Sequence, residues 1–411
     1  MERKRIALVL PIRFACRAFL NTEILQYLKS EADVAIISPY SDSPSFLARY
    51  YGEGIQHFPL LDFQYIGSHY RWNSISTAAN EKYLDAPGLK ITRSVSEYHA
   101  TQKRSNRKGM WADLKKYLLT KGIPSAFSNY LGIAFLRRAE RKSFLAAGYP
   151  QFHHYRSFLK GFRPDVVVST SPNRIQEVAL ARTTDALGVP HVTYILSFDN
   201  ICCYPDFPRI YDKYMVWNSR NKQELLKRYP AVKAEQIEIC GPIQFDFYAK
   251  RDHYMVSRAE WLYANSLPAD RPVILFAETG QFIGPNEPAV VEDMYTRLQK
   301  AGLRQRPVIL VRLHPMHPPD RWDNLHKKYP DIRFQAPTRQ RDFETKYTYT
   351  DGVIWNDDDL GLLINTLYHS DVHINVASSM ILDAAYFDRP CIGIGYDPRP
   401  NDQFNILVST L

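Results

Sequence analysis

Short apolar runs alternate with longer amphipathic stretches through the first 250 residues of the chain. The apolar runs are RIALVLPI, DVAIISPY, DVVVST, PHVTYILS, YDKYMVWN and QIEICGPI, and helix-like segments such as FLNTEILQYLKSEA and EVALARTTDALGV separate them. A run that is apolar throughout is typical of a strand that a sheet buries on both faces. Strands that alternate with helices predict a doubly wound α/β domain with a parallel sheet over residues 1–250.

The same alternation of apolar runs and amphipathic segments begins again after a polar, helix-prone segment at residues 251–270. Its apolar runs are PVILFAE, PVILVRLHP, GVIWN, VHINVASS and CIGIGYD, with amphipathic segments between them. This pattern predicts a second doubly wound domain at residues 271–411, with 251–270 as the connector. The expected fold class is therefore α/β, with two Rossmann-like domains.

The rhythm breaks between about residues 80 and 160, where aromatic, basic and leucine residues recur at helical spacing. We interpret this segment as a helical insertion in the first domain. Residues 101–142 contain eleven Lys or Arg and two acidic residues, an excess that equals the net charge of +9 of the whole chain. The interleaved aromatic and basic residues suggest a face that contacts a glycan acceptor, a polyanion or an anionic membrane surface, although a solvated helical face has the same pattern. Its candidate residues are Lys115, Lys116, Arg137 and Arg138.

The composition, 45% hydrophobic and 23% charged, is that of a globular protein, and no run approaches the ~20 apolar residues of a membrane-spanning helix. Arg13 and Arg17 interrupt the first apolar run, so it reads as a strand and not as a signal peptide. We expect a cytoplasmic protein, at most peripheral on the inner face of the membrane. Five scattered cysteines without CxxC spacing predict neither disulfides nor a zinc site, and we expect no bound metal or cofactor.

The stretch HINVASSMILDAAYFDRP contains the first candidate binding site. Ser378 and Ser379 fall at the start of a helix after a buried strand, where unpaired N–H groups favour an anion. Asp383 lies one helical turn after Ser379 on nearly the same face. The serines could hold phosphates while Asp383 binds the ribose of the same nucleotide; the alternative is a helix cap followed by a solvent-facing acid.

Two other strand ends of the second domain add candidates. Arg312 and His314 end the run PVILVRLHP, and such side chains seldom end a core strand without an anion or partner nearby. Gly280 lies in the turn after PVILFAE, where a glycine permits close approach of the backbone to a ligand. Acids at 357–359 are interpreted as the start of a helix.

The pattern R-x-HP followed by D-x-x-I-N-x-x-S-S-x-x-x-D-A-A-x-x-x-x-P resembles the GT-B superfamily of nucleotide-sugar glycosyltransferases. The resemblance is to the branch with CDP-glycerol glycerophosphotransferases, capsule polysaccharide enzymes and UDP-GlcNAc 2-epimerases, and it is strongest over Pro272–Asp397. It implies two domains that face a cleft, and a UDP, CDP, CMP or GDP donor whose diphosphate binds His314, Ser378 and Ser379. The ribose would bind Asp383, where many relatives have Glu. These proteins usually continue further than Leu411, which suggests a truncated or atypical last domain.

The expected activity is metal-independent transfer of a sugar from a nucleotide-activated donor to a cell-envelope or exopolysaccharide acceptor, glycan or lipid-linked. Transfer of a polyol phosphate, or epimerisation or hydrolysis of a sugar nucleotide, is the alternative on this fold. An inverting transferase needs a general base, for which Asp199 and Glu177 at strand ends are candidates, with Arg13 and Arg17 on the acceptor side. Asp199 fits a turn equally well, and a retaining enzyme needs no base.

A function of another class is non-catalytic binding of a polyanion or nucleic acid by the basic segment 101–142. No recognised nucleic-acid motif accompanies the charge, so nucleic acid is not an expected partner.

Overall fold

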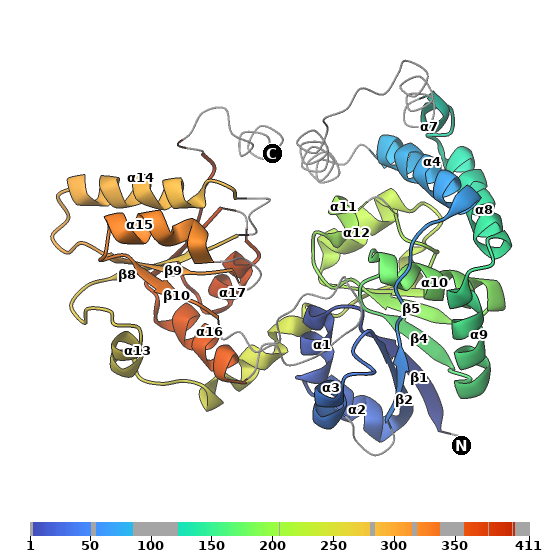
Figure 1. The fold of residues 1–411 in the computed structure, drawn as a ribbon, viewed down its shortest axis with the longest axis horizontal. Helices are drawn as coiled ribbons and strands as arrows, with labels where there is room; N and C mark the ends of the chain where they lie inside the picture. Colours follow the sequence, from blue (N-terminus) through green and yellow to red (C-terminus); the bar gives the residue numbers. More distant parts are fainter. Residues whose placement is uncertain are drawn as a thin grey trace. The chain divides into compact units, whose positions relative to one another are not determined.

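The computed structural model describes residues 3–50, 55–84, 122–204, 206–279, 284–314, 319–337, 357–376, 378–396 and 398. The chain divides into two compact units, the first spanning Met1–Gln244 and the second beginning at Phe245. Each unit is built on its own parallel sheet with helices on both faces (Figure 1). The predicted α/β class with two doubly wound domains is confirmed.

The first sheet has, within the described ranges, seven parallel strands in the order β3-β2-β1-β4-β5-β6-β7. Because the chain starts at β1, moves outward to β3 and returns to the other side of β1, the strand order reverses between β1 and β4. The strands are β1 (Lys4–Val9), β2 (Ala32–Ser38), β3 (Ile55–Pro59), β4 (Val166–Ser169), β5 (His191–Tyr194), β6 (Lys213–Val216) and β7 (Ile237–Ile239).

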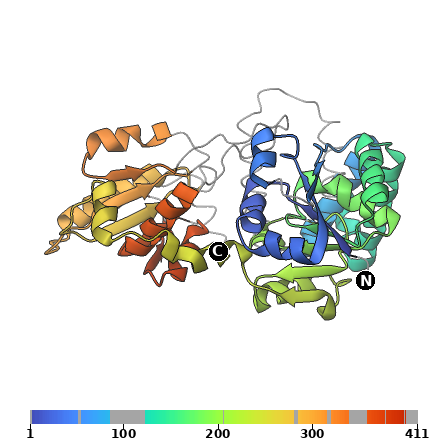
Figure 2. The ribbon, with the colours of Figure 1, turned by 90° about the horizontal axis from the view of Figure 1, so that it is seen from below.

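Helices cover both faces of this sheet, and Figures 1 and 2 show α1–α3 on one side and α8 and α9 on the other. Side chains of α9 and α10, including Tyr155, Phe158 and Val178, pack on Ala7 and Val9 of β1 in one apolar cluster. The helices are α1 (Arg13–Leu20), α2 (Ile24–Glu31), α3 (Pro44–Tyr50), α4 (Gly67–Leu84), α7 (Ile123–Ala126), α8 (Tyr130–Ala146), α9 (Pro150–Phe162), α10 (Ile175–Leu187), α11 (Asn200–Cys203), α12 (Ser219–Arg228) and the short 3₁₀ helix η2 (Ala234–Gln236).

Two details of this unit differ from the sequence pattern. The single helix expected over FLNTEILQYLKSEA is two helices, α1 and α2, separated at residues 21–23. Strand β3 was not expected, because its sequence IQHFP mixes polar residues and a proline with apolar ones. Proline is tolerated at the edge of a sheet, and β3 is an edge strand.

A buried polar network joins the helical layer of α4 and α8 to α10. The Glu140 carboxylate accepts hydrogen bonds from Nε2 of His69 (2.6 Å) and Nε of Arg182 (3.2 Å) and forms an ion pair with the Arg182 guanidinium. Nδ1 of His69 lies 2.8 Å from the hydroxyl of Tyr149, which itself accepts a hydrogen bond from the backbone N–H of Ile66. Burial and the nearby Arg182 charge lower the pKa of His69 to about 4, so its ring is neutral and donates to Glu140.

The second sheet has five parallel strands in the order β10-β9-β8-β11-β12, counted over the described part of the unit. The order reverses between β8 and β11. The strands are β8 (Val273–Ala277), β9 (Val308–Arg312), β10 (Arg333–Gln335), β11 (Val372–Asn375) and β12 (Cys391–Gly393). The expected strand GVIWN lies outside the described residues, and β10, a short run that the pattern missed, forms one edge.

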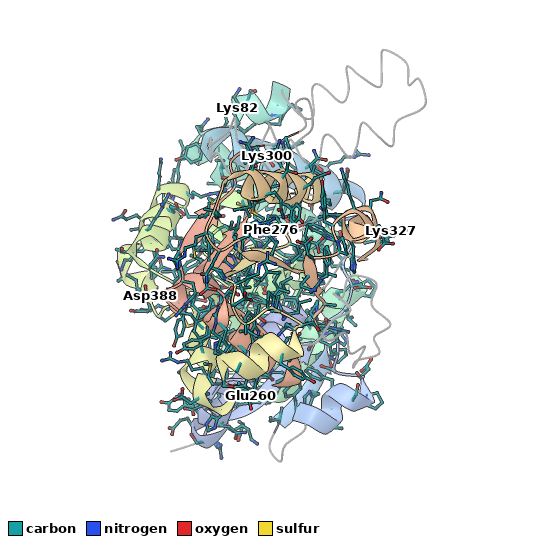
Figure 3. The ribbon with its side chains drawn as sticks, turned by 90° about the vertical axis from the view of Figure 1, so that its left-hand side faces the viewer. Lys82, Glu260, Phe276, Lys300, Lys327 and Asp388 are labelled. Carbon is teal, nitrogen blue, oxygen red and sulfur yellow. The ribbon has the colours of Figure 1, made fainter. Side chains whose placement is uncertain are left out.

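Alternate residues of β8 face opposite helical layers in the second unit. Leu275 packs with α13 and α16, whereas Phe276 packs with α14 and α15, which lie on the opposite face (Figure 1). Figure 3 shows Phe276 between Lys300 of α14 and Glu260 of α13. The helices are η3 (Ile243–His253), α13 (Arg258–Ala264), α14 (Glu287–Lys300), η4 (Pro319–Trp322), α15 (Asp323–Lys328), α16 (Asp357–His369) and α17 (Met380–Tyr386).

Candidate functional site

The carboxyl ends of three neighbouring strands carry the candidate residues of the second unit. In open parallel sheets, ligands bind at the carboxyl ends of the strands, where the strand order reverses. Here that point lies between β8 and β11, so it is bordered by Glu278 and Thr279 after β8 and by Ser378 and Ser379 after β11. His314 follows β9, the neighbour of β8 on the other side. The fold therefore gathers residues that are up to a hundred positions apart in sequence.

The side chain of Asn375, the last residue of β11, shapes the turn that contains the two serines. Its Oδ1 accepts a hydrogen bond from the N–H of Ser378 (3.3 Å), and its Nδ2 donates to the carbonyl of Ser378 (3.2 Å). The hydroxyl of Ser378 accepts from the N–H of Met380 (3.3 Å). Ser379 is exposed, and its side chain does not cap α17. Hydrogen bonds within the chain thus hold this turn without a ligand, and they leave Ser379 exposed to solvent.

Asp383, the expected ribose ligand, lies in α17 and contacts a residue that the sequence pattern did not single out. The buried hydroxyl of Tyr248 in η3 donates a hydrogen bond of 2.5 Å to Oδ1 of Asp383. This bond fixes the carboxylate with respect to the apolar core of the unit. The ribose contact itself stays a prediction.

Two buried glutamates share one guanidinium beside these loops. Arg321 of η4 lies 2.9 Å from Oε1 of Glu278 and 3.5 Å from Oε2 of Glu287, the first residue of α14. Glu278 also accepts the N–H of His314 (2.7 Å), and Glu287 accepts the N–H of Thr279 (2.8 Å). Burial raises the pKa of Glu287 to about 8, and the neighbouring Glu278 adds to this rise. The cluster ties together the loops after β8 and β9, and so it positions His314.

Arg312 has a different environment from the other candidates. It is almost fully buried, with its guanidinium bonded to Oε1 of Gln335 and 3.5 Å from Oδ1 of Asp359 at the start of α16. It therefore links β9 to β10 and α16 inside the unit. Gly280 lies outside the described residues, as do Lys115 and Lys116.

In the first unit, the strand order reverses between β1 and β4, and three candidates flank that point. Arg13 and Arg17 lie in α1 after β1; Arg13 is buried, with its guanidinium 5.4 Å from the centre of the Tyr40 ring. Glu177 lies in the first turn of α10 after β4 and is fully buried. It accepts the N–H of Ser171 (2.9 Å), and burial raises its pKa to about 7.

Asp199 follows β5 and precedes α11. Its backbone carbonyl accepts the N–H of Cys202 (3.0 Å), and its Oδ1 accepts a long hydrogen bond of 3.4 Å from Nδ2 of Asn200. This is the geometry of a turn. Asp199 is partly exposed, so between the two candidate bases it alone offers a carboxylate to solvent.

The two candidate basic residues of α8 have different environments. Arg137 is paired with Asp206 through two hydrogen bonds (2.6 and 3.2 Å), whereas Arg138 is exposed.

Within the ranges that the structure describes, no three His, Cys, Asp or Glu side chains gather as metal ligands would. None of the described helices combines the length and apolar character needed to cross a bilayer.

The raised pKa of Glu177 predicts how stability depends on pH. The protonated acid is favoured in the folded state, so its contribution to the free energy of unfolding is full below about pH 4.5 and is lost as pH rises through about 7. The loss reaches up to about 3 kcal/mol. In Glu177→Gln, which keeps the acceptor for Ser171, urea unfolding between pH 4.5 and 7.5 should show a flatter profile than the wild type. Parallel profiles would contradict the assignment.

Solved structures similar to this chain share its fold at low sequence identity. UDP-GlcNAc 2-epimerase from Methanocaldococcus jannaschii has a TM-score of 0.52 and 11% identity, with 99% of this chain and 91% of that chain covered. The structure of its complex with UDP-GlcNAc and UDP has a TM-score of 0.50 and 10% identity, with the same coverage of both chains. The S. aureus MnaA–UDP co-structure has a TM-score of 0.50 and 11% identity, with 95% of this chain and 78% of that chain covered. No family model and no curated protein matches the sequence. The chain therefore has the GT-B fold of these epimerases.

Proposed function

We propose that this protein is a metal-independent GT-B enzyme that binds a nucleotide-activated sugar in its second unit and transfers the sugar to a glycan or lipid-linked acceptor. The observation that carries the proposal is the turn after β11, preformed by Asn375, which presents Ser379 at the reversal point of the second sheet. Similar folds that were solved in complex with UDP, or with UDP-GlcNAc and UDP, support a nucleotide-sugar ligand.

In this proposal the diphosphate binds between the loops after β9 and β11. Ser378 and Ser379 offer hydroxyl and N–H groups, and His314 offers its side chain from a loop whose backbone is fixed by Glu278. Donors arranged in this way can offset the negative charge that develops on a leaving diphosphate, which is the task of a metal in other transferases. Asp383, oriented by Tyr248, takes the ribose.

Two carboxylates of the first unit are proposed as the general base of an inverting reaction. Glu177 has a pKa near neutrality, which suits a base at physiological pH, but it is fully buried. Asp199 is partly exposed and lies at the end of a neighbouring strand. We rank Asp199 first because a base must reach the acceptor hydroxyl.

Nucleotide binding tests the proposed donor site. Purified protein should be stabilised by one of UDP, CDP, GDP, CMP or ADP in a thermal-shift screen, and calorimetry should then give its dissociation constant. We expect about tenfold weaker binding for His314→Ala and for the double variant Ser378→Ala/Ser379→Ala, because each removes donors to a charged ligand. The exposed His326→Ala in α15 is the matched control and should bind as the wild type. Folded variants with wild-type affinity would refute the site.

Product analysis separates transfer from the alternative that the similar structures favour, which is epimerisation. An epimerase changes the sugar nucleotide when no acceptor is present, and a hydrolase releases free sugar. A transferase leaves the nucleotide sugar intact until an acceptor is added. Conversion of UDP-GlcNAc by the protein alone would therefore overturn the transferase proposal while leaving the donor site in place.

A further inference from the structure

A group of basic side chains lines a cavity of about 550 Å³ in the first unit, within the range of ligand-binding pockets. Four of them come from one side of α8, as two adjacent pairs that lie one helical turn apart. The other two come from α10 and from the segment before β6. Among the described residues, Asp185 is the one acid in the lining. The six basic residues are Arg137, Arg138, Arg141, Lys142, Arg182 and Arg209.

Four of the six cations already have an acidic partner. Arg137 pairs with Asp206 at 2.6 Å, Arg141 with Asp185 at 2.9 Å and Arg209 with Asp212 at 3.1 Å, and Arg182 pairs with Glu140. Arg138 and Lys142 are exposed and form no ion pair or hydrogen bond with any described residue. They lie four positions apart on the helix, where like charges destabilise each other. The cavity thus has two cations whose repulsion a bound anion would relieve.

A second, smaller cavity of about 240 Å³ adjoins the first and is lined mainly by aromatic and apolar groups. Tyr83, Tyr130 and Tyr229 contribute rings, and Arg137 and Ile210 line both cavities. The Tyr229 ring is held in place by stacking on Phe207, with centroids 4.9 Å apart and planes at 7°. The Arg137 guanidinium lies 5.4 Å from the centre of the Tyr229 ring, at the junction of the two cavities.

The larger cavity lies at the edge of the first sheet opposite to the carboxyl ends of its strands. Arg209 donates hydrogen bonds to the carbonyl of Val189 and to Thr184, next to the start of β5, and it precedes the start of β6. The expected ligand site of an open sheet is at the other, carboxyl, ends of the strands. The larger cavity therefore lies near the amino ends of β5 and β6, and Glu177 and Asp199 follow the carboxyl ends of β4 and β5. The smaller cavity borders the segment after β5, because Arg228 in its lining donates hydrogen bonds to the carbonyls of Ile201 and Tyr204.

We propose that the two cavities together form a second binding site for a sugar phosphate. The phosphate group binds Arg138 and Lys142, with Arg141 beside them, and the sugar ring packs on the tyrosines of the smaller cavity. Charge-assisted hydrogen bonds hold the anion, and the flat ring faces provide apolar contact for the C–H groups of a sugar. Arg137, fixed by Asp206 and Tyr229, joins the two halves.

Titration calorimetry at low salt, with glucose 1-phosphate as the probe, tests this site. Inorganic phosphate and glucose, the two halves of the probe, are titrated separately. We expect Arg138→Gln/Lys142→Gln to weaken glucose 1-phosphate and phosphate at least tenfold. Tyr130→Ala should weaken glucose 1-phosphate but leave phosphate unchanged. The control Lys160→Gln/Lys227→Gln removes the same charge from two other exposed positions of the unit and should bind as the wild type.

Three results would overturn the proposal. Equal weakening by the control variant would mean that only the net charge matters. Loss of glucose 1-phosphate binding in His314→Ala would place the probe in the nucleotide site. Binding to phosphatidylglycerol vesicles, and not to phosphatidylcholine vesicles, glucose 1-phosphate or phosphate, would mean that the cations serve a membrane surface. Nucleotide affinity should be unchanged in Arg138→Gln/Lys142→Gln, so failure of one site is distinguishable from failure of the other.

Discussion

Replacing Asp359 with alanine is expected to lower the free energy of unfolding of the second unit by about 3–5 kcal/mol. Asp359 is fully buried and lies 3.5 Å from the guanidinium of Arg312, which is itself almost fully buried. Without the carboxylate, Arg312 keeps Gln335 but loses a buried acidic partner. The cost of burying a cation that has lost an acidic partner, more than the lost attraction, sets the size of the effect.

Urea unfolding followed by circular dichroism measures this loss, and hydrogen exchange at β9 assigns it to the second unit. Asp270→Ala, at an exposed position of the same unit, should stay within about 0.5 kcal/mol of the wild type. The double variant Arg312→Met/Asp359→Leu should regain most of the loss, because apolar residues of similar size can replace a buried ion pair. A loss below about 1 kcal/mol in Asp359→Ala would contradict this account.

Replacing Glu140 with alanine is expected to cost the first unit about 3–5 kcal/mol. The carboxylate accepts from His69 and pairs with Arg182, so its removal leaves a buried imidazole donor and a buried guanidinium without their acceptor. Burial already lowers the pKa of Arg182 to about 10, which reflects the cost of its charge in this environment. Because the network joins α4, α8 and α10, we expect loss of α8 packing before loss of the sheet.

The measurement is urea unfolding, with hydrogen exchange compared between α8 and β1. Glu238→Ala is a matched control, because Glu238 forms an exposed ion pair with Lys213 at 3.2 Å, and exposed pairs contribute about 0–1 kcal/mol. If Glu140→Ala and Glu238→Ala shifted the unfolding midpoint equally, the network would contribute no more than a surface pair.

The sequence pattern predicted most of the strands because a parallel strand buried on both faces is apolar at every position, as in IALVLPI and PVILVRLHP. It missed β3 and β10, which are short edge strands with polar residues. Edge strands bury less of their surface, so their composition is less restricted. The serine turn was also recognisable in sequence, because strand, turn and helix follow one another directly.

The partners of the site residues could not be read from the sequence. Glu287 and Arg321 are separated from Glu278 by 9 and 43 positions, and Tyr248 is 135 positions from Asp383. An isolated acid or tyrosine has no periodic signal. Its role depends on the order of strands in the sheet, because that order decides which loops lie side by side. For Arg312 and Glu177, residue type and position after a strand were visible, but their burial was not.

The sequence by itself determined two doubly wound α/β domains and the strand ends at which polar residues gather. Hydrophobic periodicity is local, and the composition of each strand reflects how far that strand is buried. Only the tertiary structure decided which of those polar residues are held inside the core, as Arg312 is by Asp359, and which face solvent, as Ser379 and Arg138 do. It also decided where basic residues of α8, α10 and the segment before β6 surround one cavity. Burial and charge pairing depend on long-range packing, and no local pattern of residues encodes them.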